Sequence, residues 1–473
     1  MTWLALLGAG LALALLTACS SKEERPADQS APAASPTPPK KVLTMNNGAF
    51  EDEKDRLAEQ DLVRRMFEER YPGWTIENQP WQYDPAVFIP KVQSGTCSDI
   101  VGLFATEGAM VIQQKLATDL TDLVATWEAG RFMIPEIIAP YMRDGRLYGL
   151  PVGDLTGAYV MTLFYNKKLF REAGIVDENG EPRPPQTWDE FVETARRLTD
   201  RKAGRAGFGI LGDANAAGWH FLNWVWQAGG DFQQRQPDGT WKSVFDSPEA
   251  VSALQFIKDL RWKHDVLQYN LLCNNDDLME MFVAERIAMG FFAPENLVYF
   301  KDKYQMPIEH IGIALLPAGP AGRANQMGGN FNIIVASAPE DHKLMAFKYL
   351  TEFIYDPEVI EARCRLLQSQ NRVVGVPSLP AFQPEQQEKL NAIIAKYRNF
   401  PDYSALMNEA AKYVRVEPPH YCQALYSEFL SPAVQQVLTN KNADPAAILK
   451  EKNAQFQKQY LDKVNRQILA ETP

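Results

Sequence analysis

The stretch that decides the fold spans residues 163–199 and reads LFYNKKLFREAGIVDENGEPRPPQTWDEFVETARRLT. An apolar run over 159–165 predicts a strand that ends at Asn166, and a polar, proline-rich loop follows it. Thr187, with Glu190 three residues later, is typical of a capping box at the start of a helix. Apolar residues then recur at helical spacing, at Phe191, Val192, Ala195 and Leu198. The stretch therefore predicts a strand, a loop and a helix within an α/β domain.

The start of the chain predicts export and a lipid anchor. Residues 3–16 form an apolar segment about as long as the core of a signal peptide and too short to span a bilayer. They end in LTAC at 16–19, a match to the lipobox of bacterial lipoproteins, in which Cys19 is lipidated and becomes the first mature residue. A chance cysteine is the alternative, and the first three residues lack the usual Lys or Arg. We expect a signal peptide over 1–18 and an extracytoplasmic protein anchored to the bacterial membrane, in the periplasm or on the outer face of the cell.

Composition narrows the remaining possibilities. Residues 19–41 are rich in Ser, Ala, Pro and charge, which predicts a disordered tether. The net charge of −11 argues against nucleic acid as a partner, because phosphate binding needs a basic surface. Scattered histidines and the absence of a Cys/His cluster predict no metal and no cofactor. The remaining cysteines are Cys97, Cys273, Cys364 and Cys422. The sequence allows either up to two disulfides among them or free thiols.

The first part of the mature chain alternates strands and helices. The apolar pattern predicts a strand over 42–45, a helix over 55–71, a strand over 74–77, a helix through Val92 and a strand over 98–101. This β-α-β-α-β order implies a parallel, doubly wound sheet with ligand-binding loops at the carboxyl ends of its strands.

Several motifs together resemble the bacterial extracellular solute-binding proteins that serve ABC importers. The segment 163–199 is similar to the sugar-binding family that includes maltose- and glycerol-phosphate-binding proteins. Further matches are KVQSGTCSDIV at 91–101, DGRLYGLPV at 144–152 and MGGN at 327–330. FVAERIAM at 282–289 also resembles a family element, although Glu285 replaces the usual glycine. The resemblance extends over residues 42–459, nearly the whole mature chain.

The resemblance implies a two-lobed periplasmic-binding-protein-like fold, with doubly wound sheets in each lobe and a ligand cleft between them. The N-terminal lobe would comprise 42–152 and 331–368, and the C-terminal lobe 153–330 and 369–473. The chain would cross between lobes at 153–156, 327–330 and 369–374. The implied function is capture of a sugar or oligosaccharide by a monomer, through lobe closure, for delivery to the membrane subunits of an importer.

The expected site binds a ligand and has no catalytic residue, because no catalytic motif is present. Aromatic faces stack on the C–H faces of sugars, and planar polar groups bind their hydroxyls. Such residues at strand ends and crossings are therefore the candidates. Those of the first lobe are Phe50, Glu51, Trp81 and Glu107. Those near the crossings and in the second lobe are Asp154, Tyr159, Trp219, Phe292, Glu295 and Asn330.

Two alternatives stay open at this point. The ligand could be glycerol phosphate, a polyamine or a peptide; several Arg or Lys in the cleft would favour phosphate, and several carboxylates would favour amines. The protein could also be an exported, lipid-anchored glycoside hydrolase, which needs two suitably spaced carboxyl groups. The adjacent pair Asp276 and Asp277 is more typical of a solvated loop.

Overall fold

A five-stranded sheet forms the first part of the computed structural model, which describes residues 40–152, 159–213 and 216–471. Its strands lie in the order β2 (Trp74–Asn78), β1 (Lys41–Met45), β3 (Ile100–Phe104), β14 (Asn330–Ile334) and β6 (Leu150–Val152). β1 pairs in parallel with β2 and β3, as the sequence predicts, whereas β14 is antiparallel to β3 and β6. The parallel strands place their carboxyl ends at one edge of the sheet.

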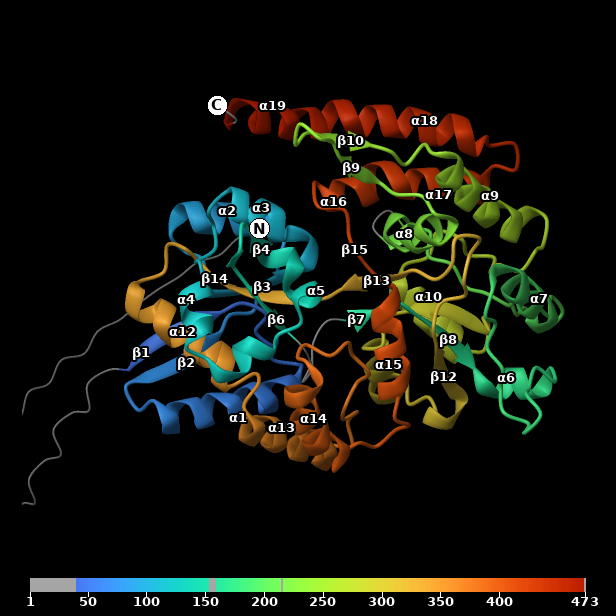
Figure 1. The fold of residues 1–473 in the computed structure, drawn as a ribbon. Coiled ribbons are helices and arrows are strands. Elements are labelled where there is room, and N and C mark those ends of the chain that lie inside the picture. The colour runs from blue at the N-terminus through green and yellow to red at the C-terminus, as the bar shows by residue number, and fades with distance from the viewer. Residues whose placement is uncertain (1–39, 153–158, 214–215, 472–473) are drawn as a thin grey trace, which may run out of the picture. The chain divides into compact units, whose positions relative to one another are not determined.

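Helices pack on this sheet and enclose the first apolar core (Figure 1). The connecting helices are α1 (Lys54–Arg70) and α2 (Pro85–Ser94), and later ones are α3 (Gly108–Gln113), α12 (Glu340–Glu352), α13 (Pro357–Ser369) and α14 (Pro384–Ala395). Fully buried aromatic rings dominate the core, among them Phe67, Phe88, Tyr141 and Phe331. Tyr141 and Phe331 stack at 4.4 Å between ring centroids.

A second sheet organises the other lobe. β8 (Thr162–Asn166) lies between β11 (Met289–Phe292) and β12 (Ile311–Ala314), antiparallel to both. The helices around it are α6 (Lys167–Glu172), α7 (Trp188–Leu198), α8 (Ala216–Ala228), α9 (Pro248–Trp262), α17 (Ser431–Thr439) and α18 (Pro445–Phe456). α19 (Asp462–Glu471) follows α18 and packs against β10 (Trp241–Ser243). The second core contains Trp224, which stacks on Phe291 at 4.8 Å.

Most of the deciding stretch folds as its pattern predicts. The predicted strand 159–165 is split, because Met161 separates β7 (Tyr159–Val160) from β8. Thr187 caps α7 by accepting a hydrogen bond from the Glu190 amide at 3.2 Å. The Glu190 carboxylate reaches one residue further back than in a capping box and accepts from the Gln186 amide at 2.9 Å. The buried face of α7 comprises Trp188, Phe191, Thr194, Ala195 and Leu198.

A small third sheet joins the two lobes. β13 (Asn325–Gly328) lies between β7 and β15 (Val414–Val416), and the single residue Gly329 separates it from β14 of the first sheet. Gly329 has a φ of 145°, which favours glycine. At Gly328 an added Cβ would lie 2.3 Å from the Tyr159 ring, so only glycine fits there. Residues 327–330 are therefore the passage from the third sheet to the first.

The position of α14 differs from the predicted division, which assigned 369–473 to the second lobe. Leu390 and Ile394 of α14 belong to the first core, and α14 packs beside α13 (Figure 1). Before α14, Val373 already packs in a further core of the second lobe with Phe164 and Phe282, and the chain joins the second core from Cys422 onward. Helical spacing identifies an apolar face but not the lobe that buries it, and this is why the sequence placed α14 elsewhere.

Some predictions fall on residues outside the described ranges: the signal peptide, nearly all of the tether, lipidated Cys19, the crossing at 153–156 and Asp154. Within the described ranges all four cysteines are free thiols, and three are buried. No group of His, Cys, Asp and Glu in those ranges could hold a metal ion. None of the helices described is long and apolar enough to cross a membrane.

Candidate functional site

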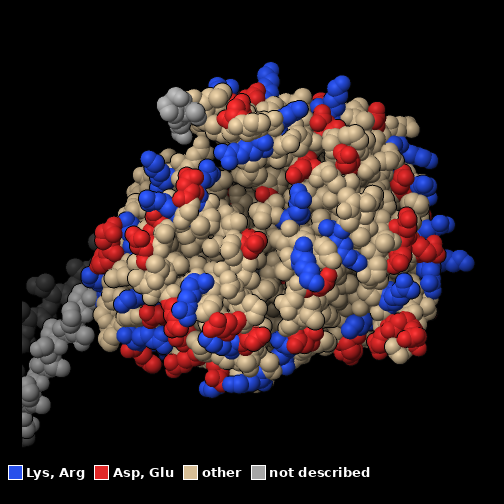
Figure 2. All heavy atoms as spheres, viewed as in Figure 1, with Lys and Arg blue, Asp and Glu red and all other residues tan. Residues whose placement is uncertain are grey.

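Three adjoining cavities form a cleft between the lobes, with volumes of about 220, 230 and 520 Å³. All three are lined by Thr106, and together they are called the cleft below. Figure 2 shows the surface hollowed where α3 faces α16 (Cys422–Ala424) in Figure 1. The 220 Å³ cavity is lined by Phe104, Ala105, Thr106, Tyr159, Ala216, Trp219, Gly328, Gly329, Glu417, Gln423 and Tyr426.

The walls of the cleft come from both lobes. One wall is the carboxyl end of β3 with the short helix Ala105–Glu107 and α3. The opposite wall is the start of α8 with the segment from Val416 to Tyr426. Gly328 and Gly329 of the third sheet line the cleft between the walls. A ligand in the cleft would therefore contact both lobes and the crossing at once.

Aromatic rings line both walls. Phe104 is 44% exposed at the end of β3 and meets Tyr83 edge-on, with ring centroids 5.8 Å apart. On the other wall the rings of Tyr159 and Trp219 meet at 6.2 Å and 76°. A ring that packs against a second ring on one side has a fixed orientation, and its other side can stack on the flat C–H surface of a sugar.

Glu417 is a buried carboxyl at the centre of a hydrogen-bond network. Its Oε1 accepts from Trp219 Nε1 at 2.5 Å and from Gln326 Nε2 at 2.7 Å. Gln326 is tied in turn to Asn223 of α8, through its Oε1 at 3.1 Å and its backbone amide at 2.9 Å. Burial opposes the charged form and raises the pKa of Glu417 to about 7, although the hydrogen bonds from Trp219, Gln326 and Tyr426 lower it.

Glu107 is a second buried carboxyl and lines the largest cavity. It accepts from the Tyr83 hydroxyl at 2.8 Å, and burial raises its pKa. Its negative charge also raises the pKa of Glu417. Among the described lining residues of the cleft, Arg143 is the only Lys or Arg. The cleft therefore offers acceptors and rings, with little positive charge.

The structure brings three of the predicted residues together in the cleft: Glu107, Tyr159 and Trp219. Two more lie close to it. Asn330 is exposed and directly follows Gly329, and the charge of Glu295 contributes to the raised pKa of Tyr159.

The other predicted residues lie elsewhere. Phe50 and Glu51 are exposed after β1 and do not line the cleft. Trp81 donates to Ser98 Oγ at 3.1 Å and packs on the first core. Phe292 is 1% exposed, and its ring packs in the second lobe against Phe164, Phe282 and Phe300.

Sequence reasoning missed four lining residues. Phe104 is not among the candidates, although an aromatic residue at the end of a predicted strand was the signal available. Glu417, Gln423 and Tyr426 carry no motif, and the fold alone brings them to the cleft.

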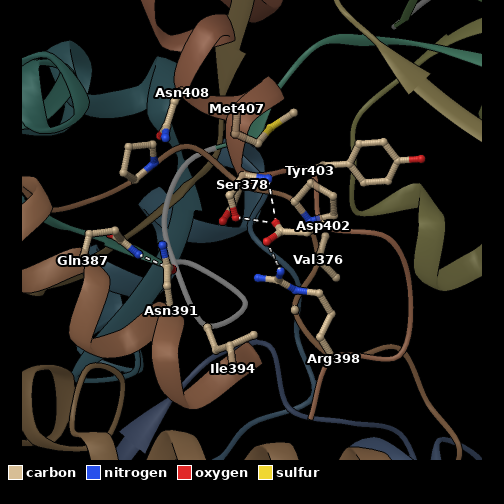
Figure 3. A pocket seen from close by; sticks show the side chains of 14 residues that line it. Val376, Ser378, Gln387, Asn391, Ile394, Arg398, Asp402, Tyr403, Met407 and Asn408 are labelled. Atoms are coloured by element: carbon tan, nitrogen blue, oxygen red, sulfur yellow. Dashed lines mark hydrogen bonds and ion pairs between the residues drawn. The ribbon is translucent and has the colours of Figure 1, made fainter. Parts of the chain in front are cut away.

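Two other cavities hold polar groups that already bond to one another. Figure 3 shows a cavity of about 50 Å³ beside α14, where Asp402 accepts from Ser404 and pairs with Arg398 at 2.5 Å. It has room for about one or two waters. A cavity of about 210 Å³ between α1 and α13 contains Arg56 and Arg363, whose charges pair with Glu53 and Glu59. The cleft is the better candidate for a solute.

Comparison with known proteins identifies the class. The family described as bacterial extracellular solute-binding protein matches residues 48–359, about two thirds of the chain. The protein belongs to this family, and its α/β fold is the two-lobed fold that the sequence predicts.

Individual relatives are more distant. A putative binding protein of Brucella abortus (strain 2308) is 27% identical over 280 residues, which cover 58% of this chain and 63% of that relative. The sn-glycerol-3-phosphate-binding periplasmic protein UgpB of the same strain is 36% identical over 76 residues, 16% of each chain.

Solved structures share the fold. An ABC transporter solute-binding protein of Thermotoga lettingae TMO, bound with alpha-D-tagatose, superposes with a TM-score of 0.69 at 23% identity and covers 88% of this chain and 99% of its own. Maltose-bound MalE3 of T. maritima gives 0.66 at 23% identity with the same coverage.

Proposed function

We propose that this protein is the extracytoplasmic substrate-binding component of an ABC importer and captures a carbohydrate in the cleft. Membership of the solute-binding family supports the binding role. The lining of the cleft is the main support for a carbohydrate ligand, because the rings of Phe104, Tyr159 and Trp219 lie beside carboxyl and amide acceptors. Structures of the same fold that hold tagatose, maltose and ribitol support it further.

The proposed mechanism is closure of the two lobes on the ligand. The third sheet connects the lobes through β13, and the cleft has one wall on each lobe. A ligand that contacts both walls stabilises the closed arrangement over the open one, which shifts the equilibrium toward closure. The closed monomer would then deliver its ligand to the importer's membrane subunits, and a lipid on Cys19 would keep it beside them.

The lining favours a neutral carbohydrate over the other solutes. Glycerol phosphate needs cations, and Arg143 alone supplies one among the described lining residues. A polyamine needs free carboxylates, but Glu417 already accepts from neutral donors of the protein, Trp219 and Gln326. The hydrolase alternative would require turnover of a bound oligosaccharide by Glu107 and Glu417.

A thermal-shift screen tests the proposal. The probes are D-tagatose, maltose, maltotriose and ribitol, with glycerol 3-phosphate, spermidine and a dipeptide as competing classes. A carbohydrate at a hundredfold excess over its Kd should stabilise the protein by about 2.7 kcal/mol and raise its Tm. The bound sugar should be recovered unchanged by chromatography. A shift with glycerol 3-phosphate or spermidine alone, or hydrolysis of maltotriose, would contradict the proposal.

A further inference from the structure

We propose that Glu417 is the positioning residue of the cleft: its carboxyl holds the Trp219 ring and the strand β13 in one arrangement, and the gain of a proton loosens that hold. The consequence for ligand binding rests on the proposed function, because it requires that Trp219 meets the ligand. The protonation of Glu417 and its effect on Trp219 do not require a ligand.

The geometry places Glu417 where three elements meet. It follows β15, and Val416 of β15 pairs with Met327 of β13. Its Oε1 accepts hydrogen bonds from α8, through Trp219, and from β13, through Gln326. Glu417 is 8% exposed, so water cannot readily replace these bonds. The orientation of Trp219 is therefore coupled to the strand that crosses between the lobes.

The charge of Glu417 decides the strength of this coupling. Hydrogen bonds to an ionised carboxylate are roughly twice as strong as bonds between neutral groups. Protonation would therefore weaken the bonds from Trp219 and Gln326 without removing the acceptor. Because the pKa of Glu417 is raised to about 7, this change falls near neutral pH.

Two histidines near Glu417 titrate far from that range. His220, beside Trp219 on α8, has its pKa lowered to about 3 by burial, and burial of His420 lowers its pKa to about 4. Arg143 shares one cavity with Glu417. Arg415, two residues before Glu417, pairs with Asp231 at the surface.

Burial raises the pKa of the tyrosine, cysteine and glutamate neighbours of Glu417, whereas it lowers that of the two histidines. It raises the pKa of the Tyr159 and Tyr426 hydroxyls and of the Cys422 thiol well above their ordinary values. Glu107 is the remaining acid that acts on Glu417, and burial raises its pKa as well. Glu107 is therefore the group that a control experiment must separate from Glu417.

Intrinsic fluorescence of the ligand-free protein tests the proposal. The chain has ten tryptophans, so the signal of Trp219 is taken as the difference between wild type and Trp219→Phe. Between pH 5.5 and 8.5 this difference should show one transition with a midpoint near the pKa of Glu417, about 7. Glu417→Gln should abolish the transition, because glutamine keeps an acceptor oxygen but cannot ionise, and Glu107→Gln should retain it.

Two results would overturn the proposal: a transition that survives in Glu417→Gln, or a wild-type spectrum without a Trp219 transition. If Glu417→Gln does not fold, the difference between wild type and Trp219→Phe still shows whether the Trp219 signal has a transition near pH 7. Affinity for maltose, measured at pH 5.5 and 8.5, should be higher at pH 8.5 in wild type and equal at both in Glu417→Gln. Failure of D-tagatose, maltose, maltotriose and ribitol to bind at either pH would count against the proposed function and leave the fluorescence result in force.

Discussion

The free energy of unfolding of the wild type should fall as pH rises through about 7, and replacing Glu417 with glutamine should remove this pH dependence. Folding raises the pKa of this carboxyl from 4.5 to about 7. Each pH unit between these two values corresponds to about 1.4 kcal/mol, so the full effect is at most about 3.5 kcal/mol. The raised pKa means that the folded state binds the proton more tightly. Its contribution is therefore complete below pH 4.5 and is lost as pH rises through about 7.

The assay is urea unfolding of wild type and Glu417→Gln at intervals from pH 5 to 8.5. The free energy of unfolding of the variant, relative to wild type, should increase by up to about 3 kcal/mol over this range. Glu193→Gln, at an exposed position on α7, serves as the matched control, and its difference from wild type should stay constant. A difference for Glu417→Gln that does not change with pH would refute the argument that this carboxyl is buried and titrates near neutral pH.

Three further predictions concern the scaffold and the anchor. Thr187→Ala removes the cap of α7 and should lower the free energy of unfolding by about 1 kcal/mol, whereas Ser252→Ala, at an exposed hydroxyl inside α9, should change it by less than about 0.5 kcal/mol; equal effects in urea unfolding would contradict the capping role. Glu59→Gln removes the charge that pairs with the half-buried Arg363 and should lower the free energy of unfolding by about 1 kcal/mol or more, and an unchanged free energy of unfolding would contradict a stabilising role of this pair. Cys19→Ala should move the protein from the membrane fraction to the soluble fraction, and continued membrane association would refute lipidation at Cys19.

The sequence predicts the scaffold well because its helices and strands depend on interactions between residues close together in the chain. Alternating strands and helices at the start of the mature chain, and the helix capped by Thr187, follow from spacing and caps within a few residues. The glycines at 328 and 329 mark a crossing because close packing and a positive φ exclude other residues there. Each of these features depends on neighbours in the sequence.

The site is only partly local. Glu107 could be predicted because it follows a strand, Tyr159 because it flanks a crossing, and Trp219 because it lies at the start of a helix. Glu417 could not, because it reaches Trp219 only through the pairing of β13 with β15, and the two residues are 198 positions apart in the chain. Phe292 ends a strand whose pattern does not say which face is buried, and its ring lies in the core.

Titration calorimetry on wild type and Phe104→Ala tests the central claim, that the cleft binds a carbohydrate between its aromatic rings. The sugar is the one that gives the largest thermal shift, and Tyr269→Ala is the control, because that ring is 67% exposed and does not line the cleft. Wild type and control should bind one equivalent with equal affinity, and Phe104→Ala should bind about tenfold more weakly, equivalent to about 1.4 kcal/mol of lost stacking. Unchanged affinity in Phe104→Ala, or no binding of any carbohydrate by wild type, would contradict the account.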